Sequence, residues 1–138
     1  MTQRKVIQYD NYVDKSDYEW GHGTHVAGSV AGVKNDGSGI AKGIAYNAKL
    51  AFLDIGRSDG SLITPDVSRL LSTGSPYAQI HSASWGGSYA GYGLMSYFFD
   101  SYTYNDNDEL LVLIAAGNSG RDDAAQTVGG KFLLFIHP

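Results

Sequence analysis

The residue best suited to chemistry in this sequence is His22, which lies in the glycine-rich stretch Gly21–Gly32. The apolar residues of this stretch recur at helical spacing, at Val26, Ala27, Val30 and Ala31. His22 precedes Val26 by one turn, so we expect it on the buried stripe at the N-terminus of a helix, where protonation is disfavoured. A neutral, buried and oriented imidazole can act as a general base.

The same stretch contains four glycines, and helix propensity does not explain them. Glycine within a helix costs about 1 kcal/mol relative to alanine. Small residues do, however, allow other backbones to approach to contact distance. We therefore expect close packing of other segments against this helix.

A second group of candidate residues follows the most apolar run of the chain. Leu110–Ala116 is apolar throughout, which is typical of a strand buried on both faces. Gly117–Gly120 follows directly, and in parallel α/β sheets ligands bind at the carboxyl ends of the strands. The side-chain amide of Asn118 can donate there to a developing negative charge.

Predicted strands and helices alternate along the chain, which favours a parallel α/β sheet. Further strands are predicted at Val6–Tyr9, Lys49–Asp54 and Gln79–Trp85, and loops at residues 34–39, 56–61 and 105–109. A helix running to about Thr73 is expected to place Pro65 at its first position. A third, aromatic-rich helix is expected at about 94–103, and the tyrosines between Tyr89 and Tyr104 should pack along one face of it and the adjoining loop.

Composition sets the class of the protein. The 138 residues suffice for one domain with a core. The net charge of −4, without a basic patch, argues against nucleic acid and membrane surfaces as partners. The absence of cysteine excludes disulfides, thiol chemistry and cysteine-ligated metals. We find neither a signal-peptide core nor an apolar run of membrane-spanning length, so we expect a soluble chain.

The run His22–Gly28 (HGTHVAG), together with Ala115–Gly120 (AAGNSG), resembles two signatures of the subtilisin-like serine peptidases, or subtilases. The first matches the catalytic-histidine signature of the family without a gap, and the second matches its oxyanion-hole asparagine signature. Ile40–Leu53 resembles the loop and strand that follow the histidine helix, and Ser82–Gly87 resembles the substrate-binding strand. The resemblance extends over roughly Val6 to Val128.

The resemblance implies a three-layer fold, in which a parallel sheet is flanked by helices, and a peptide or protein substrate. His22 would take a proton from a serine nucleophile and return it to the leaving amine. Asn118 would donate to the oxyanion. The backbone groups of Ser84, Trp85 and Gly86 would pair with an extended substrate as an added strand.

Further expectations come from the same family. Ser58–Leu62 would form the other wall of the substrate groove. The family requires no cofactor in its chemistry and is typical of the extracellular space or the secretory pathway.

The sequence departs from the family at two of the three triad positions. Only 21 residues precede His22, and no aspartate among them has the Asp-Ser/Thr-Gly context of the triad acid. Only 20 residues follow Asn118, without a Gly-Thr-Ser-Met-Ala nucleophile motif. Residues 1–138 are thus interpreted as a partial peptidase domain, inactive alone and needing the missing parts of its own domain. Since the missing acidic strand lies mid-sheet in the family, we expect a gap or a re-paired sheet.

Several alternatives stay open from the residues alone. The chain could be a non-catalytic peptide-binding pseudo-peptidase that retains the groove. A metal hydrolase using His22 and His25 is a third hypothesis, although the pair lacks the His-Glu-x-x-His pattern. We expect no metal there and a packed, hydrogen-bonded core position for His25. Asn35–Gly37 could hold calcium or form a plain turn, and residues 131–138 could be a final strand or the product of a truncated or misread frame.

Overall fold

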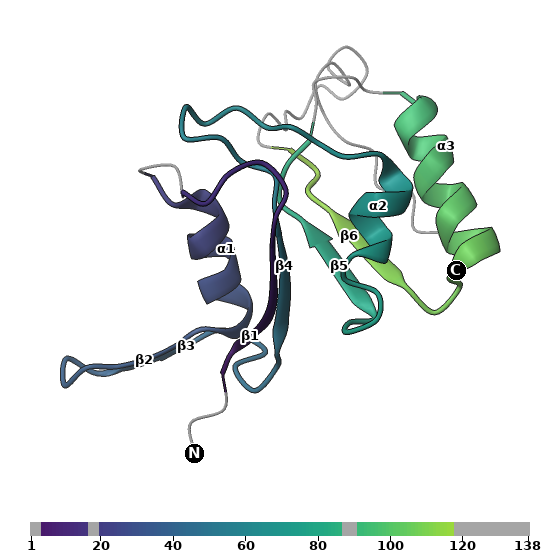
Figure 1. Cartoon of the computed structure of the whole chain (residues 1–138). Helices are drawn as coiled ribbons and strands as arrows, with labels where there is room; N and C mark the ends of the chain where they lie inside the picture. The colour runs from purple at the N-terminus through teal and green to yellow at the C-terminus, as the bar shows by residue number, and fades with distance from the viewer. Residues whose placement is uncertain (1–3, 17–19, 87–90, 118–138) are drawn as a thin grey trace, which may run out of the picture. The chain divides into compact units, whose positions relative to one another are not determined.

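The computed structural model describes residues 4–16, 20–86 and 91–117, and the chain divides into two compact units between Tyr77 and Ala78 (Figure 1). The described strands form three separate two-stranded sheets. No helix in the described part of the chain is long and apolar enough to cross a membrane.

The first unit is built on two parallel strands, β1 (Val6–Asn11) and β4 (Leu50–Asp54). The ring of Tyr9 on β1 stacks on that of Phe52 on β4, with centroids 5.6 Å apart. The Tyr9 hydroxyl also donates to the Asp54 carboxylate at the end of β4. Both predicted strands are therefore confirmed, and β1 extends two residues beyond its predicted end at Tyr9.

Helix α1 (His22–Ala31) confirms the predicted helix and packs by a narrow stripe of small residues. The residues of this stripe are buried or half-buried: Gly23, Val26, Ala27, Val30 and Ala31. An added Cβ at Gly23 would lie 3.2 Å from the Cζ of Phe52, so glycine lets the first turn approach β4 closely.

Backbone hydrogen bonds hold the carboxyl end of α1. Three backbone N–H groups donate to its carbonyl oxygens: Gly43 to Gly32 (2.8 Å), Ile44 to Ser29 (3.1 Å) and Ala45 to Val30 (2.8 Å). These bonds satisfy carbonyls that a helix end otherwise leaves without partners. An added Cβ at Gly43 would lie 2.7 Å from the Gly28 oxygen, which confirms the expected close backbone approach.

The loop predicted at 34–39 is the turn of an antiparallel hairpin, formed by strands β2 (Val33–Asn35) and β3 (Ile40–Lys42). It is shorter than predicted, because Lys34 and Asn35 belong to β2. Within the turn, Asp36 accepts hydrogen bonds from the backbone N–H (3.1 Å) and hydroxyl (2.5 Å) of Ser38. Lys34 forms an ion pair with Asp36 at 3.1 Å. The Asp36 carboxylate is thus engaged within the turn, and calcium binding there stays a prediction.

Helix α2 (Val67–Ser72) begins two residues later than predicted. The Asp66 carboxylate accepts a hydrogen bond from the Arg69 backbone N–H at 2.8 Å and caps the helix. Pro65 therefore precedes the cap, and its predicted place as the first helical residue was wrong. The core of the first unit is small and aliphatic, with fully or nearly buried side chains at Ala31, Ile55, Val67, Leu70 and Leu71.

The second unit contains the parallel pair β5 (Ile80–Ala83) and β6 (Leu111–Ile114). Helix α3 (Leu94–Ser101) continues into a π-helical segment, η1 (Tyr102–Asp106), which replaces the first part of the loop predicted at 105–109. The buried residues of the second unit are Ala83, Phe99, Tyr102 and Leu110.

Two burial predictions for the second unit were wrong. Leu111 and Leu113 on β6 are 42% and 39% exposed, so only one face of this strand is covered. In the described residues β6 has one neighbouring strand, β5, so fewer side chains surround it than surround a central strand of a larger sheet. Of the tyrosines predicted to pack, Tyr102 is buried as expected, whereas Tyr92, Tyr97 and Tyr104 are mostly exposed.

Parallel pairing was predicted correctly for both strand pairs. Among the residues described, β4 pairs only with β1, and β5 pairs only with β6. The mixed α/β content and the small parallel sheets are compatible with part of a subtilase fold.

The contact at Gly43 generates a stability prediction. We expect Gly43→Ala to lower the free energy of unfolding by about 1–3 kcal/mol, because its Cβ would meet backbone atoms that cannot turn aside. Gly28→Ala is the matched control, since an added Cβ there meets nothing within 4 Å. That control should raise stability, by up to about 1 kcal/mol, through helix propensity. Urea unfolding followed by circular dichroism measures both, and equal midpoints for the two variants would contradict the prediction.

Candidate active site

The catalytic candidate His22 is the first residue of α1 and is exposed. Its predicted burial was wrong, because the packed stripe runs through Gly23 and Ala27 and one residue turns a helix by about 100°. Gly21, in the left-handed region at φ 56°, precedes it as the N-cap. The imidazole has no hydrogen-bond or ion-pair partner in the part of the chain that the structure describes, so it is accessible but not oriented.

His25 is exposed as well, which overturns its predicted place in the core. It lies on the side of α1 away from the packed stripe, and its backbone is engaged in the helix, with the N–H donating to the Gly21 oxygen at 2.8 Å. Within the described ranges, no group of three or more histidine, aspartate or glutamate side chains could hold a metal ion.

The buried acid of the first unit is Asp54, which sequence reasoning did not single out. Its carboxylate accepts from the Tyr9 hydroxyl and from the Gly56 backbone N–H at 3.1 Å. The Gly56 contact orders the turn that follows β4, and the Tyr9 contact joins β1 to the end of β4. A structural role therefore explains the burial of Asp54. The sequence signal for this residue was its position at the end of an otherwise apolar strand.

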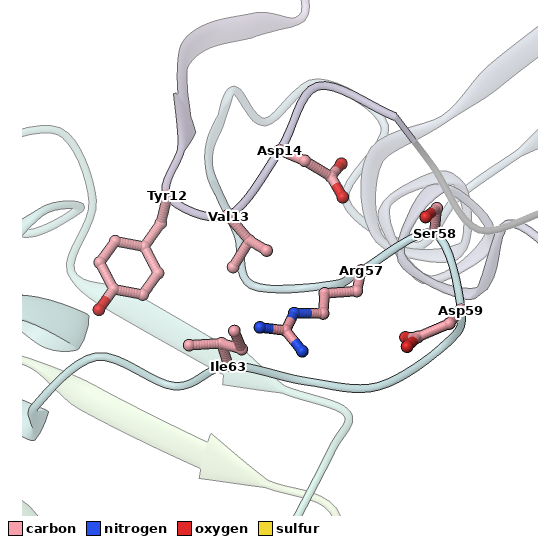
Figure 2. A pocket seen from close by; sticks show the side chains of 7 residues that line it. All are labelled: Tyr12, Val13, Asp14, Arg57, Ser58, Asp59 and Ile63. Atoms are coloured by element: carbon pink, nitrogen blue, oxygen red, sulfur yellow. The ribbon is translucent and has the colours of Figure 1, made fainter.

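A pocket of about 460 Å³ opens in the first unit between the segments that follow β1 and β4 (Figure 2). It is lined by Tyr12, Val13, Asp14, Arg57, Ser58, Asp59 and Ile63. The strands are parallel, so their carboxyl ends meet at one edge, where ligands of α/β sheets bind. The expected groove wall at Ser58–Leu62 contributes to this pocket, whereas the segment 12–14 was not predicted to take part.

Two aspartates of the pocket are held as anions by short local turns. The Ser16 backbone N–H and hydroxyl donate to Asp14, at 2.8 and 2.9 Å, and lower the pKa of its carboxyl. The Ser61 hydroxyl and backbone N–H do the same for the pKa of Asp59, at 2.6 and 2.9 Å. The nearby positive charge of Arg57 favours the ionised form of both carboxyls further. Both groups are therefore anionic throughout the neutral range.

The remaining candidates belong to the second unit. Ser84, Trp85 and Gly86 directly follow β5, with Ser84 and Gly86 exposed and Trp85 half-buried. Gly117 lies just after β6, adopts φ 86° and is the last residue that the structure describes. Asn118 lies outside the described residues, as do Ser119 and the segment 131–138. The oxyanion role of Asn118 and the substrate-binding role of Ser84–Gly86 stay predictions.

His81, at the centre of β5, was not predicted as a functional residue. Its Nε2 atom is buried and has no hydrogen-bond partner among the residues that the structure describes. Burial lowers the pKa of this imidazole below its ordinary value, because the charged form loses hydration without a compensating partner. The sequence signal was a lone histidine within a strand-like apolar run.

The sequence matches the model of the subtilase family over residues 2–131. It is 37% identical over 126 residues to the serine protease/ABC transporter B family protein tagB of Dictyostelium discoideum. It is also 37% identical over 132 residues to tagD of the same organism, and 38% identical over 72 residues to the protease KEX1 of Kluyveromyces lactis.

These alignments cover most or half of this chain but only a small part of each relative. They include 84% of this chain for tagB and 86% for tagD, but 7% of the length of either relative. For KEX1 the shares are 52% of this chain and 9% of the relative. The chain thus spans a small fraction of the length of the curated relatives it matches. No solved structure matches it significantly.

His81 generates a prediction on pH dependence. Its pKa is lower in the folded state than the ordinary value of 6.5 shown by the unfolded chain. The stability from the neutral, buried imidazole is therefore complete above pH 6.5 and is lost as the pH falls through the folded-state pKa. His81→Leu should reduce the slope of the free energy of unfolding against pH, measured by urea unfolding between about pH 7 and 5. The reduction should correspond to up to about one bound proton.

His25→Leu is the control for this measurement, because His25 is exposed on α1. We expect this variant to keep the slope of the unmodified chain. An unchanged slope in His81→Leu would show that other groups set the pH dependence.

Proposed function

Because this chain belongs to the subtilase family of serine peptidases, we propose that it is part of an endopeptidase domain carrying the catalytic histidine and the oxyanion-hole asparagine. His22 is the general base and Asn118 the oxyanion donor. The single observation that carries the proposal is the unbroken HGTHVAG motif, with His22 exposed at the N-terminus of α1.

The position of His22 suits proton transfer to and from a bound substrate. A general base must come within hydrogen-bond reach of the group that it deprotonates, and an exposed side chain leaves that space open. The contact of Gly23 with Phe52 fixes the first turn of α1 against β4, and thus fixes the backbone that bears His22. The helix supplies position, while the orientation of the imidazole must come from another group.

In the subtilase mechanism that group is a carboxylate, which holds the correct tautomer and stabilises the imidazolium. No such partner of His22 occurs among the described residues, and neither the acid motif nor the serine motif occurs in the sequence. We propose that the chain alone is inactive and that segments outside it supply both groups. The unpaired edges of β4 and β5 in the described structure support this, because each can accept an added parallel strand.

The substrate in this proposal is an extended peptide. Ser84–Gly86 follow a strand of a parallel pair, and Ser84 and Gly86 are exposed, which suits pairing with a substrate as an added strand. The same feature supports the second candidate function, a non-catalytic peptide-binding module. The absence of both triad motifs from the sequence also favours this function.

The chain alone should neither hydrolyse casein nor react with a fluorophosphonate probe, because it lacks the nucleophile. Extension by an upstream segment with the acid motif and a downstream segment with the serine motif should give both activities. In the extended protein, His22→Ala should abolish hydrolysis, whereas His25→Ala should retain it. Labelling of the 138-residue chain by the probe would contradict the proposed inactivity.

Asn118→Ala provides a separate test of the oxyanion role in the same extended protein. Removing one oxyanion-hole donor in a subtilisin, a member of this family, lowers turnover by about 10²–10³, and we expect a loss of this order. Unchanged turnover would remove Asn118 from the mechanism. If the extended protein binds peptides but never cleaves them, the non-catalytic function is the correct one.

A further inference from the structure

The first turn of α1, which bears His22, lacks the side-chain contacts that usually fix the start of a helix. Gly21 is the N-cap, so no side chain caps the helix, and the turn contains no acidic residue. The turn is closed by the His25 backbone N–H, which donates to the Gly21 oxygen at 2.8 Å. Helix ends fray, because their first N–H groups have no partners within the helix. A turn of this kind therefore needs a contact from outside the helix if it is to position a catalytic group.

Phe52 of β4 supplies such a contact. Its Cζ atom lies 3.2 Å from the point that a Cβ of Gly23 would occupy. Gly23 directly follows His22, so the tip of the ring meets the backbone of the turn that bears the histidine. The next residue of β4, Leu53, points to the opposite face of the strand, because successive side chains alternate. Among these neighbours on β4, the contact thus belongs to Phe52.

The ring of Phe52 is itself held from the side by Tyr9. The two residues are partners in the parallel pairing of β1 with β4, and their rings are coplanar within the stack, at 0° and with centroids 5.6 Å apart. The Tyr9 hydroxyl donates to the buried carboxylate of Asp54, which also accepts from the Gly56 N–H at 3.1 Å. Tyr9 is thus tied at its far end, and the stack restrains the Phe52 ring against turning away from α1.

We propose that Phe52, braced by Tyr9, is the positioning residue of the catalytic histidine. The inference rests on the proposed function, because it takes His22 to be the general base. The His22 imidazole has no hydrogen-bond or ion-pair partner within the described ranges, so its place in this chain is set by its backbone. A displacement of about 1 Å can lower a rate about 10²-fold, and the contact of Phe52 with Gly23 opposes such a displacement.

Loss of this contact acts on the chemical step and not on substrate binding. The residues proposed to pair with the peptide, Ser84–Gly86, follow β5 in the second unit, whereas Phe52 belongs to the first. A variant at Phe52 therefore lowers kcat and kcat/KM equally and leaves KM unchanged. A purely structural weakening of the domain would lower its stability without this division between kcat and KM.

The first experiment measures peptide hydrolysis by the extended protein, at a temperature below the unfolding midpoint of every variant. Phe52→Leu keeps an apolar side chain but removes the ring, and should lower kcat about 10- to 100-fold with KM unchanged. Phe52→Tyr adds a hydroxyl to Cζ, the atom next to Gly23, and should also lower kcat, by displacing the turn. Tyr9→Leu removes the brace and should give a smaller loss of the same kind.

Leu53→Ala is the matched control, because Leu53 is the half-buried neighbour of Phe52 on β4 and faces away from it. This variant loses apolar contacts within the same strand and should retain the kcat of the unmodified protein.

The second experiment follows the turn itself in the 138-residue chain, by amide hydrogen exchange measured with NMR. Phe52→Leu should raise the exchange rate of the His25 N–H, which closes the first turn, about tenfold. The Gly32 N–H, which donates to the Gly28 oxygen at 2.8 Å at the other end of α1, should keep its rate. Leu53→Ala should leave the ratio of these two rates unchanged.

The inference is overturned by an unchanged kcat in Phe52→Leu, by an equal loss of kcat in Leu53→Ala, or by a rise in KM alone. An unchanged ratio of the two exchange rates in Phe52→Leu overturns it as well. Full activity of Phe52→Leu contradicts this inference and leaves the endopeptidase proposal standing. If the unmodified extended protein cleaves no peptide, the endopeptidase proposal fails, and the exchange rates then decide whether Phe52 holds the turn.

Discussion

The first unit depends on close approach of backbone to backbone around α1. The helix has no side-chain N-cap bond, no acidic residue in its first turn and no basic residue in its last. Its two ends are fixed instead by the contact of Gly23 with Phe52 and by N–H donors from residues 43–45. An added Cβ would meet backbone atoms at 2.7 Å at Gly43 and a ring atom of Phe52 at 3.2 Å at Gly23, so glycine at these two positions permits the close approach.

This constraint also explains why the sequence predicted some features of α1 and missed others. Small residues and glycines at helical spacing correctly indicated a helix packed closely against other segments. They did not locate the centre of the packed stripe, which passes through Gly23 and not through His22. Glycine has no hydropathy to mark a face, so the pattern placed the histidine on the wrong side. His25 was misplaced for the same reason.

Elsewhere, prediction succeeded for the four strands of the two parallel pairs, whereas it missed the hairpin β2–β3, the start of α2 and the contacts between distant segments. The strands and their parallel pairing follow from apolar runs separated by helices, and they were found. Burial on both faces of β6 depends on neighbours that the run itself does not encode, and Leu111 is exposed. Likewise, no spacing rule joins Tyr12 to Arg57; they line one pocket because two parallel strands end at the same edge.

The three turns at Asp14, Asp36 and Asp59 share one construction, in which an aspartate binds the backbone and hydroxyl of a serine two residues later. Such turns draw their order chiefly from contacts separated by two positions in the chain. Two of them border the pocket. Local hydrogen bonds therefore order part of its rim ahead of any binding event, which lowers the conformational entropy that binding there would cost.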